Sequence, residues 1–111
     1  MRFDEKRVLV TGASRGIGRA IALQFAAAGA RVAVHYQTNQ SAAETTLAEL
    51  PGTGHTLCAG DVADPDAVSQ LVAETVTDLG GLDILVNNAG IFEAHPVDEV
   101  SYEDWQHHWQ R

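Results

Sequence analysis

Cysteine is almost absent from this chain, in which Cys58 stands alone. A single cysteine excludes a disulfide bond within the chain, and such sparing use fits a reducing compartment. Cys58 lies in a short apolar stretch, so we expect a small buried strand residue rather than a reactive thiol.

Positive charge and long apolar runs are also scarce. Lys and Arg number 7 against 15 Asp and Glu, and the formal net charge is −8. This balance argues against nucleic acid or an anionic membrane as a partner. No apolar run approaches the roughly 18 residues that span a membrane, and no signal-peptide core follows the charged residues 1–7. We therefore expect a cytoplasmic protein.

Glycine, in contrast, is concentrated near the start of the chain. Residues 8–10 form an apolar run typical of a strand buried on both faces, and Gly12, Gly16 and Gly18 follow it. Glycines permit positive φ angles and let a ligand approach the backbone closely. A helix begins at this point, and its first N–H groups have no intrahelical acceptor. We expect the bare amides of residues 11–19 to bind a pyrophosphate.

Three motifs compete for this stretch. A Walker loop requires Gly-Lys-Ser or Gly-Lys-Thr after the first glycine and four residues, and no lysine is present there. Residues 12–16 satisfy G-x-S-x-G, which would make Ser14 a hydrolase nucleophile on a strand-to-helix turn. That interpretation leaves Gly18 unexplained and has no oxyanion loop before it. A dinucleotide site explains all three glycines, although their spacing is longer than G-x-G-x-x-G.

Two motifs then resemble one known family. Residues 11–18, Thr-Gly-Ala-Ser-Arg-Gly-Ile-Gly, are similar to the T-G-x-x-x-G-x-G signature of the classical short-chain dehydrogenases/reductases. Residues 87–90, Asn-Asn-Ala-Gly, resemble the N-N-A-G signature of the same family. The resemblance implies an NAD(P)-dependent oxidoreductase that transfers hydride to or from a carbonyl or alcohol, such as a 3-oxoacyl thioester or general ketone. It also implies a homo-oligomer, dimer or tetramer, for the complete protein.

The resemblance carries roles for residues beyond the glycine turn. The Asp61 side chain would lie by the adenine amino group, and Val62 would pack on the ring. Asn87 would tie neighbouring strands together through its side chain, while Asn88 would contact the cofactor mainly through its backbone. The expected cofactor-binding residues are Gly12, Ser14, Arg15, Gly16, Ile17, Gly18, Tyr36, Asp61, Val62, Asn88, Ala89 and Gly90.

The end of the second expected strand, residues 31–36, selects between the two nicotinamide nucleotides. An Asp or Glu there would bind the ribose 2′-hydroxyl of NAD. Residues 35–39 contain neither, and Arg15 offers a guanidinium that suits a 2′-phosphate. We therefore expect NADP, with NAD as the alternative. His35 could assist the phosphate, although a partly exposed strand histidine needs no such role.

The remaining pattern alternates helix and strand. Helices are expected from Ile17 to Ala28, from a Ser41 cap to Leu50, and after an Asp64 cap. Strands are expected at residues 55–59 and 82–86. These elements predict an incomplete, doubly wound α/β Rossmann-type sheet of about four parallel strands in the order 3-2-1-4, with helices on both faces. Residues 91–97 are expected to form a loop.

Catalytic residues are not expected in this chain. The family reaction uses a serine and a Tyr-x-x-x-Lys pair, whereas Gln40 follows Tyr36 and Gln106 follows Tyr102 at that spacing. At 111 residues, the chain is short for a complete α/β enzyme. We expect residues 1–111 to be the single cofactor-binding domain of a longer reductase.

The last part of the sequence leaves a second possibility open. A helix is expected from Ser101, bearing two tryptophans, and strand 82–86 would present an open edge. The alternative is therefore a non-catalytic dinucleotide-binding module that dimerises through these elements. His107 and His108 are adjacent and point about 100° apart on a helix, so no metal is expected.

Overall fold

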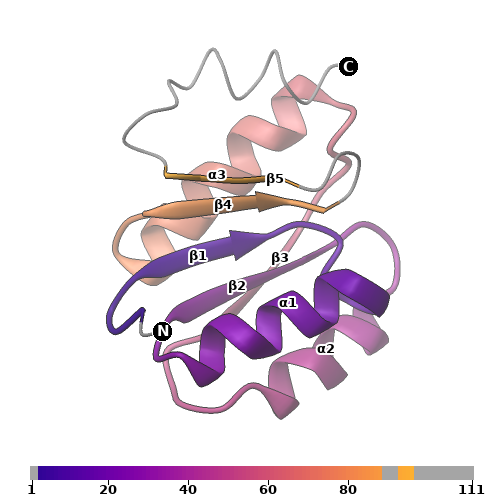
Figure 1. Ribbon diagram of the computed structural model, residues 1–111. Coiled ribbons are helices and arrows are strands. Elements are labelled where there is room, and N and C mark those ends of the chain that lie inside the picture. The colour runs from indigo at the N-terminus through magenta and orange to yellow at the C-terminus, as the bar shows by residue number, and fades with distance from the viewer. Residues whose placement is uncertain (1–2, 89–92, 97–111) are drawn as a thin grey trace.

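The computed structural model of the chain describes residues 3–88 and the backbone of residues 93–96. These residues form strands and helices in alternation, followed by a final pair of strands (Figure 1). In chain order the elements are β1 (Arg7–Val10), α1 (Gly16–Ala27), β2 (Arg31–Tyr36), α2 (Gln40–Glu49), β3 (Thr56–Ala59), α3 (Pro65–Leu79), β4 (Ile84–Asn87) and β5 (Glu93–Pro96).

The described strands form a five-stranded sheet in the order β3-β2-β1-β4-β5. Strands β1 to β4 are parallel, and β5 runs antiparallel to β4. Helices α1 and α2 cover one face of the sheet, and α3 covers the other (Figure 1). The expected doubly wound fold with parallel order 3-2-1-4 is confirmed.

Side chains of the central strand β1 alternate between two apolar cores. Val8 and Val10 belong to the cluster beneath α1 and α2, whereas Leu9 belongs to the cluster beneath α3. All three side chains are fully buried. Since a strand with helices on both faces has no solvent side, the apolar run of β1 follows directly from its central position.

The expected loop at residues 91–97 is wrong for the segment that forms β5. Val86 of β4 lies opposite Ala94, and Asn87 lies opposite Glu93. An unpaired strand edge presents N–H and C=O groups that a returning chain can satisfy, so β4 does not have the open edge we expected. The helix expected from Ser101 lies outside the described residues.

Helix ends follow local capping chemistry, with one correction. Asp64 caps α3 as expected by accepting a hydrogen bond from the Asp66 N–H at 3.0 Å. Helix α2 begins two residues earlier than a Ser41 cap predicts, because its cap is Asn39, which accepts from the Ala42 N–H at 3.0 Å. Both Asn and Asp are strong N-caps, and the competing serine lies inside the helix.

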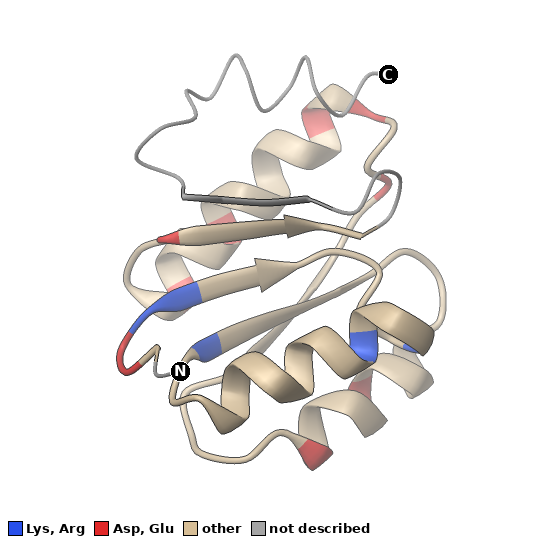
Figure 2. Ribbon diagram, viewed as in Figure 1, with Lys and Arg blue, Asp and Glu red and all other residues tan. Residues whose placement is uncertain are grey.

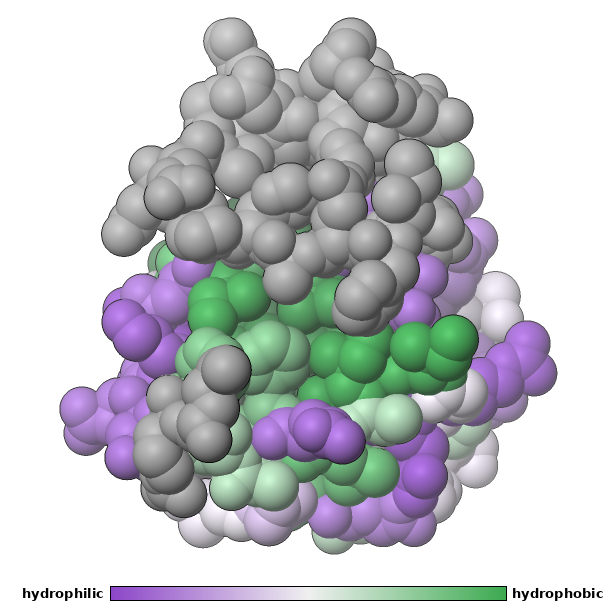
Figure 3. All heavy atoms as spheres, in the orientation of Figure 1, coloured by the Kyte–Doolittle hydropathy of each residue, from purple (hydrophilic) through white to green (hydrophobic). Residues whose placement is uncertain are grey.

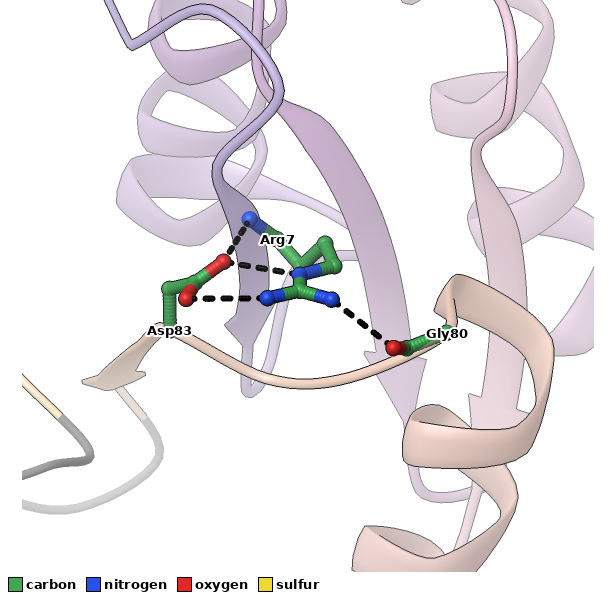
Figure 4. Close-up of polar contacts among 3 residues, drawn as sticks. All are labelled: Arg7, Gly80 and Asp83. Carbon is green, nitrogen blue, oxygen red and sulfur yellow. Dashed lines mark hydrogen bonds and ion pairs between the residues drawn. The ribbon is translucent and has the colours of Figure 1, made fainter.

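A charged pair joins the beginnings of two neighbouring strands (Figure 4). The Arg7 Nε donates to Asp83 Oδ2 at 2.8 Å, and Nη2 donates to Oδ1 at 3.1 Å. A third guanidinium N–H, on Nη1, donates to the Gly80 carbonyl at 2.8 Å. Arg7 thereby links β1 both to the end of α3 and to the approach to β4.

Within the described ranges, none of the helices is long and apolar enough to cross a membrane. The same residues bring together no group of three or more His, Cys, Asp or Glu side chains suited to a metal ion.

Candidate nucleotide-binding site

Each glycine of the turn after β1 meets a separate steric demand. Gly12 and Gly16 adopt φ angles of +61° and +63°, a region that L side chains rarely occupy. Gly18 is buried in the first turn of α1, where a Cβ would collide with the Gly12 carbonyl and lie 2.6 Å from Asn88 Nδ2. These glycines therefore let α1 begin directly against the carboxyl end of β1.

The first amides of the turn are already hydrogen-bonded inside the protein. Thr11 N–H donates to the Val86 carbonyl at 3.0 Å, and Ala13 N–H donates to the His35 carbonyl at 2.9 Å. Gly12 N–H donates to His35 Nδ1 at 3.0 Å. The amides of residues 11–13 are therefore not free for the pyrophosphate expected at residues 11–19, because they anchor the turn to two strands.

The amides that remain for an anion lie at the start of α1. N–H groups of the first helical residues, Gly16 to Gly18, have no acceptor within the helix. Arg15 precedes them in an extended conformation and contributes no side-chain cap, and the first turn carries no acidic residue. Arg15, Gly16 and Ile17 are exposed, and basic residues lie near this end of α1 in Figure 2. Dipole, donors and charge all fit a phosphate.

Asn88 joins the turn to the end of β4. Its backbone N–H donates to Thr11 Oγ1 at 2.9 Å, and its Nδ2 donates to the Gly12 carbonyl at 3.2 Å. Thr11 Oγ1 in turn donates to the Val86 carbonyl at 3.3 Å. The Asn88 side chain thus ties the end of β4 to the glycine turn, whereas the sequence assigned a side-chain tie to Asn87. The contact expected between the Asn88 backbone and the cofactor stays a prediction.

Asn87 has a different environment from the one expected. It is the last residue of β4 and is 3% exposed, and its Oδ1 has no hydrogen-bond partner among the described residues. Ala89 and Gly90 lie outside the described residues.

The carboxyl end of β2 also differs from expectation at His35. This side chain is 1% exposed rather than partly exposed, and both ring nitrogens contact backbone groups. It is therefore not available to a 2′-phosphate. Tyr36 is half-buried against the core beneath α1 and α2, and its carbonyl accepts from the Gly60 N–H at 3.3 Å.

Asp61 follows β3 at the same edge of the sheet. Its side chain is exposed, and Oδ1 accepts from the Ala63 N–H at 2.9 Å, as in a residue that begins a turn. Val62 is half-buried against the core beneath α3. Both residues lie beyond the carboxyl end of β3, next to the point where Gly60 meets β2.

Ser14 lacks the surroundings of a hydrolase nucleophile. Its carbonyl accepts from the Thr46 hydroxyl of α2 at 3.2 Å, which holds the turn from the second helix. The buried histidine of this region, His35, has both nitrogens engaged by Gly12 and Gly60 and cannot serve as a base. Cys58 is equally unsuited to act as a nucleophile, because burial raises the pKa of its thiol to about 12.

An apolar groove of about 720 Å³ runs along the outer side of α1. Phe3, Ile17, Ile21 and Phe25 contribute to its lining, and Gln24 is the polar side chain within it. Figure 3 shows apolar residues gathered on this face of the molecule. Because its lining is almost entirely apolar, the groove is poorly suited to a phosphate.

A family profile described as short chain dehydrogenase matches residues 6–110. The chain belongs to this family. The three glycines of the short-chain dehydrogenase signature are the ones that the turn requires, Gly12 and Gly16 for their positive φ angles and Gly18 for close packing.

Curated relatives of this short-chain dehydrogenase chain are oxidoreductases by name. Glucose 1-dehydrogenase of Gluconobacter oxydans is 43% identical over 107 residues, which are 95% of this chain and 40% of that protein. The 3-oxoacyl-acyl-carrier-protein reductase FabG of Staphylococcus aureus is 44% identical over 102 residues, 90% of this chain and 42% of the relative. The chain thus spans about two fifths of the length of these relatives.

Solved structures agree with the fold of this short-chain dehydrogenase chain. A dehydrogenase/reductase from Sinorhizobium meliloti superposes with a TM-score of 0.76 at 41% identity, covering 93% of this chain and 42% of the other. A short chain dehydrogenase from Burkholderia cenocepacia, solved in complex with NADP, has a TM-score of 0.75 at 39% identity. That match covers 99% of this chain and 51% of the other.

Sequence reasoning missed the roles that three residues have in holding the turn. Thr11, His35 and Thr46 each bond the turn and are fully or almost fully buried. Thr46 does carry a weak signal, since it lies one helical turn from Ala43 and Leu50 on the apolar face of α2. The two contacts of His35 join segments distant in sequence, which no local pattern indicates.

Proposed function

We propose that residues 1–111 form the single dinucleotide-binding domain of an NADP-dependent oxidoreductase. The observation that carries this proposal is the start of α1. Its first amides have no acceptor within the helix, Arg15 at the N-cap position makes no side-chain cap, and the first turn has no acidic residue, all of which favour an anion. The bound nicotinamide would supply the hydride, and the residues of this chain would bind and orient the nucleotide. The substrate would be a carbonyl or alcohol, such as a 3-oxoacyl thioester or a general ketone.

The proposed contacts are those of the turn and of the strand ends around it. Amides of Gly16, Ile17 and Gly18 would hold the pyrophosphate, while Gly12 and Ser14 would shape the turn. Asp61 and Val62 would face the adenine from beyond β3. The further proposed contacts are Arg15, Tyr36, Asn88, Ala89 and Gly90.

Preference for NADP over NAD is supported by the charges at the end of β2. Residues 37–39 are exposed and contain no carboxylate, so a 2′-phosphate meets no opposing charge there. Arg15 is exposed at the turn and contributes a guanidinium. A dinucleotide carrying a 2′-phosphate should therefore bind more tightly than one carrying a hydroxyl.

Calorimetric titration with NADP⁺ and NAD⁺ tests the proposal. NADP⁺ should bind more tightly, and Arg15→Gln should raise its Kd about tenfold while changing the Kd of NAD⁺ little. Arg19→Gln is the matched control, because Arg19 lies in the first turn of α1, close to Arg15, but is paired with Glu49. Absence of binding by either nucleotide to folded protein would refute the proposed function, and equal affinities would refute the preference.

The cellular setting is proposed on the same basis. We place the protein in the cytoplasm, as a homo-oligomer, with small-molecule substrates and neither nucleic acid nor membrane as partner. A non-catalytic module that dimerises through its fourth strand is disfavoured, because β5 already pairs with that edge.

A further inference from the structure

His35 connects two loops that lie at the same edge of the sheet. Its Nδ1 is 3.0 Å from the Gly12 nitrogen, and its Nε2 is 2.8 Å from the Gly60 carbonyl oxygen. Gly12 is 23 residues before it and Gly60 is 25 residues after it. The imidazole therefore spans from the glycine turn to the segment that precedes Asp61.

The partners of the ring determine where its proton lies. Gly12 offers an N–H, so Nδ1 must be the unprotonated acceptor. Gly60 offers a carbonyl oxygen, so Nε2 must carry the proton and donate it. Both contacts are satisfied together only by the neutral Nε2–H tautomer of His35.

The contacts of His35 act on the residues that shape the nucleotide site. Gly12 has a positive φ angle, and its carbonyl accepts from Asn88 Nδ2. The backbone of His35 adds a bond, since its carbonyl accepts from the Ala13 N–H at 2.9 Å. At the other end of the ring, the Gly60 N–H donates to the Tyr36 carbonyl. Gly60 therefore bonds to two consecutive residues of β2, His35 and Tyr36.

We infer that neutral His35 is a positioning residue for the nucleotide. It holds the glycine turn and the loop after β3 at a fixed distance from each other. This inference rests on the proposed nucleotide-binding function. His35 does not touch the nucleotide itself, because its side chain is buried and both nitrogens are engaged.

Protonation of His35 would break this link. A second N–H on Nδ1 would face the Gly12 N–H, so that two donors would meet in a buried site. Burial lowers the pKa of the imidazole below its ordinary value of 6.5, and the hydrogen bond to the Gly60 carbonyl partly offsets this. The neutral form therefore persists into mildly acidic solution, and nucleotide affinity should fall only when the pH passes below that lowered value.

Charged groups around the ring are few in the described residues and lie mostly in solvent. On β3, Cys58 is opposite His35 in the strand register, and its thiol stays protonated. Exposed groups on the surrounding elements are screened by water. They are Arg15 on the glycine turn, Asp61 and Asp64 on the loop after β3, and Asp66, Glu74 and Asp78 on α3.

Two amide variants separate the contacts. His35→Asn places an oxygen near the position of Nδ1 and retains an acceptor for Gly12, whereas His35→Gln places its amide near Nε2 and retains the donor for Gly60. Each variant breaks one of the two contacts that fix the separation, so calorimetry with NADP⁺ at pH 8 should show a raised Kd for His35→Asn as well. His35→Gln should raise the Kd about fivefold to tenfold, the worth of one buried hydrogen bond.

His55 provides the matched control. Its Nδ1 accepts from the Val32 N–H at 3.1 Å and its Nε2 contacts the Pro51 carbonyl at 2.7 Å, so it makes the same kind of bridge at the opposite end of β2. His55→Asn and His55→Gln should leave the Kd of NADP⁺ unchanged. Circular dichroism melts of every variant restrict the comparison to folded protein.

The pH profile and the ring signals decide the result. Titration of the nucleotide 2′-phosphate affects all variants equally, so it cancels when the wild-type Kd is divided by the His35→Asn Kd. This ratio should rise as the pH falls and His35 becomes protonated. Nitrogen NMR should show the Nε2–H tautomer at pH 8. If wild type binds NADP⁺ but His35→Gln binds equally well, or the ratio stays flat, the inference is overturned while the proposed function stands. If folded wild type binds no nucleotide, the proposed function itself fails.

Discussion

Gly18 packs against the carbonyl of Gly12, and this contact lets α1 begin directly above the end of β1. Gly16 is different, because a Cβ there would meet no atom within 4 Å and only its φ angle of +63° opposes a side chain. Two glycines of one motif are thus required for different physical reasons, one for close approach and one for backbone conformation.

Replacement of Gly18 should therefore be more damaging than replacement of Gly16. Gly18→Ala forces the helix away from Gly12 and Asn88 and should lower the free energy of unfolding by about 1–3 kcal/mol, the cost of overpacking. It should also weaken NADP⁺ binding, because the amides of α1 move. Gly16→Ala should cost about 1 kcal/mol of backbone strain. Urea unfolding of both variants measures the difference, and an equal loss would contradict the steric account.

Helix α3 shows how one element is defined by residues at its ends. Asp64 caps it, Pro65 occupies its first turn and Gly80 closes it with a φ angle of +82°. Between these ends, Val68, Leu71, Thr75 and Leu79 turn towards the sheet. The helix buries one stripe, and its acidic residues, which Figure 2 shows spread along its length, are exposed.

Loss of the α3 cap should lower stability without altering the fold. Asp64→Ala removes the acceptor for the Asp66 N–H and should reduce the free energy of unfolding by about 1 kcal/mol. Asp66→Ala is the control, since it removes a first-turn charge but retains the cap and should cost less. Chemical denaturation with an unchanged m-value would support the capping role. A loss from Asp66→Ala as large as that from Asp64→Ala would contradict it.

In the whole molecule, Arg7 and Asp83 join segments that are 76 residues apart (Figure 4). The Arg7 guanidinium, through its hydrogen bonds first, holds the pKa of the Asp83 carboxyl below its ordinary value of 3.8. The Asp83 backbone N–H also donates to the Arg7 carbonyl at 2.9 Å. β1 and β4 are therefore aligned at their beginnings as well as along their pairing.

The pH dependence of unfolding reports on this pair. Because the folded state has the lower pKa, the ion pair contributes its full stability above the ordinary value of 3.8 and loses it as the pH falls through the folded value. Asp83→Asn should lower the melting temperature at pH 7 and flatten its decline below about pH 4. Glu74→Gln changes an exposed carboxylate and serves as control. An Asp83→Asn decline as steep as that of wild type would exclude this linkage.

Local chemistry was sufficient to predict much of this molecule. Apolar runs of the buried strands, the glycine turn and the cap of α3 each depend on residues close together in the chain, so their pattern indicates the element directly. The parallel order 3-2-1-4 followed from the alternation of strand and helix together with the family resemblance. Boundaries shifted by only a residue or two, as at Asn39, where two good caps competed for one helix start.

Contacts across the sheet depended on where distant segments meet in space. His35 reaches Gly12 and Gly60, Asn88 rather than Asn87 ties the turn, and β5 covers the edge of β4. Each outcome depends on where a strand ends and which face a side chain then occupies, and a shift of one residue reverses that face. Local composition encodes which elements form, whereas the pairing of their ends is settled by packing in three dimensions.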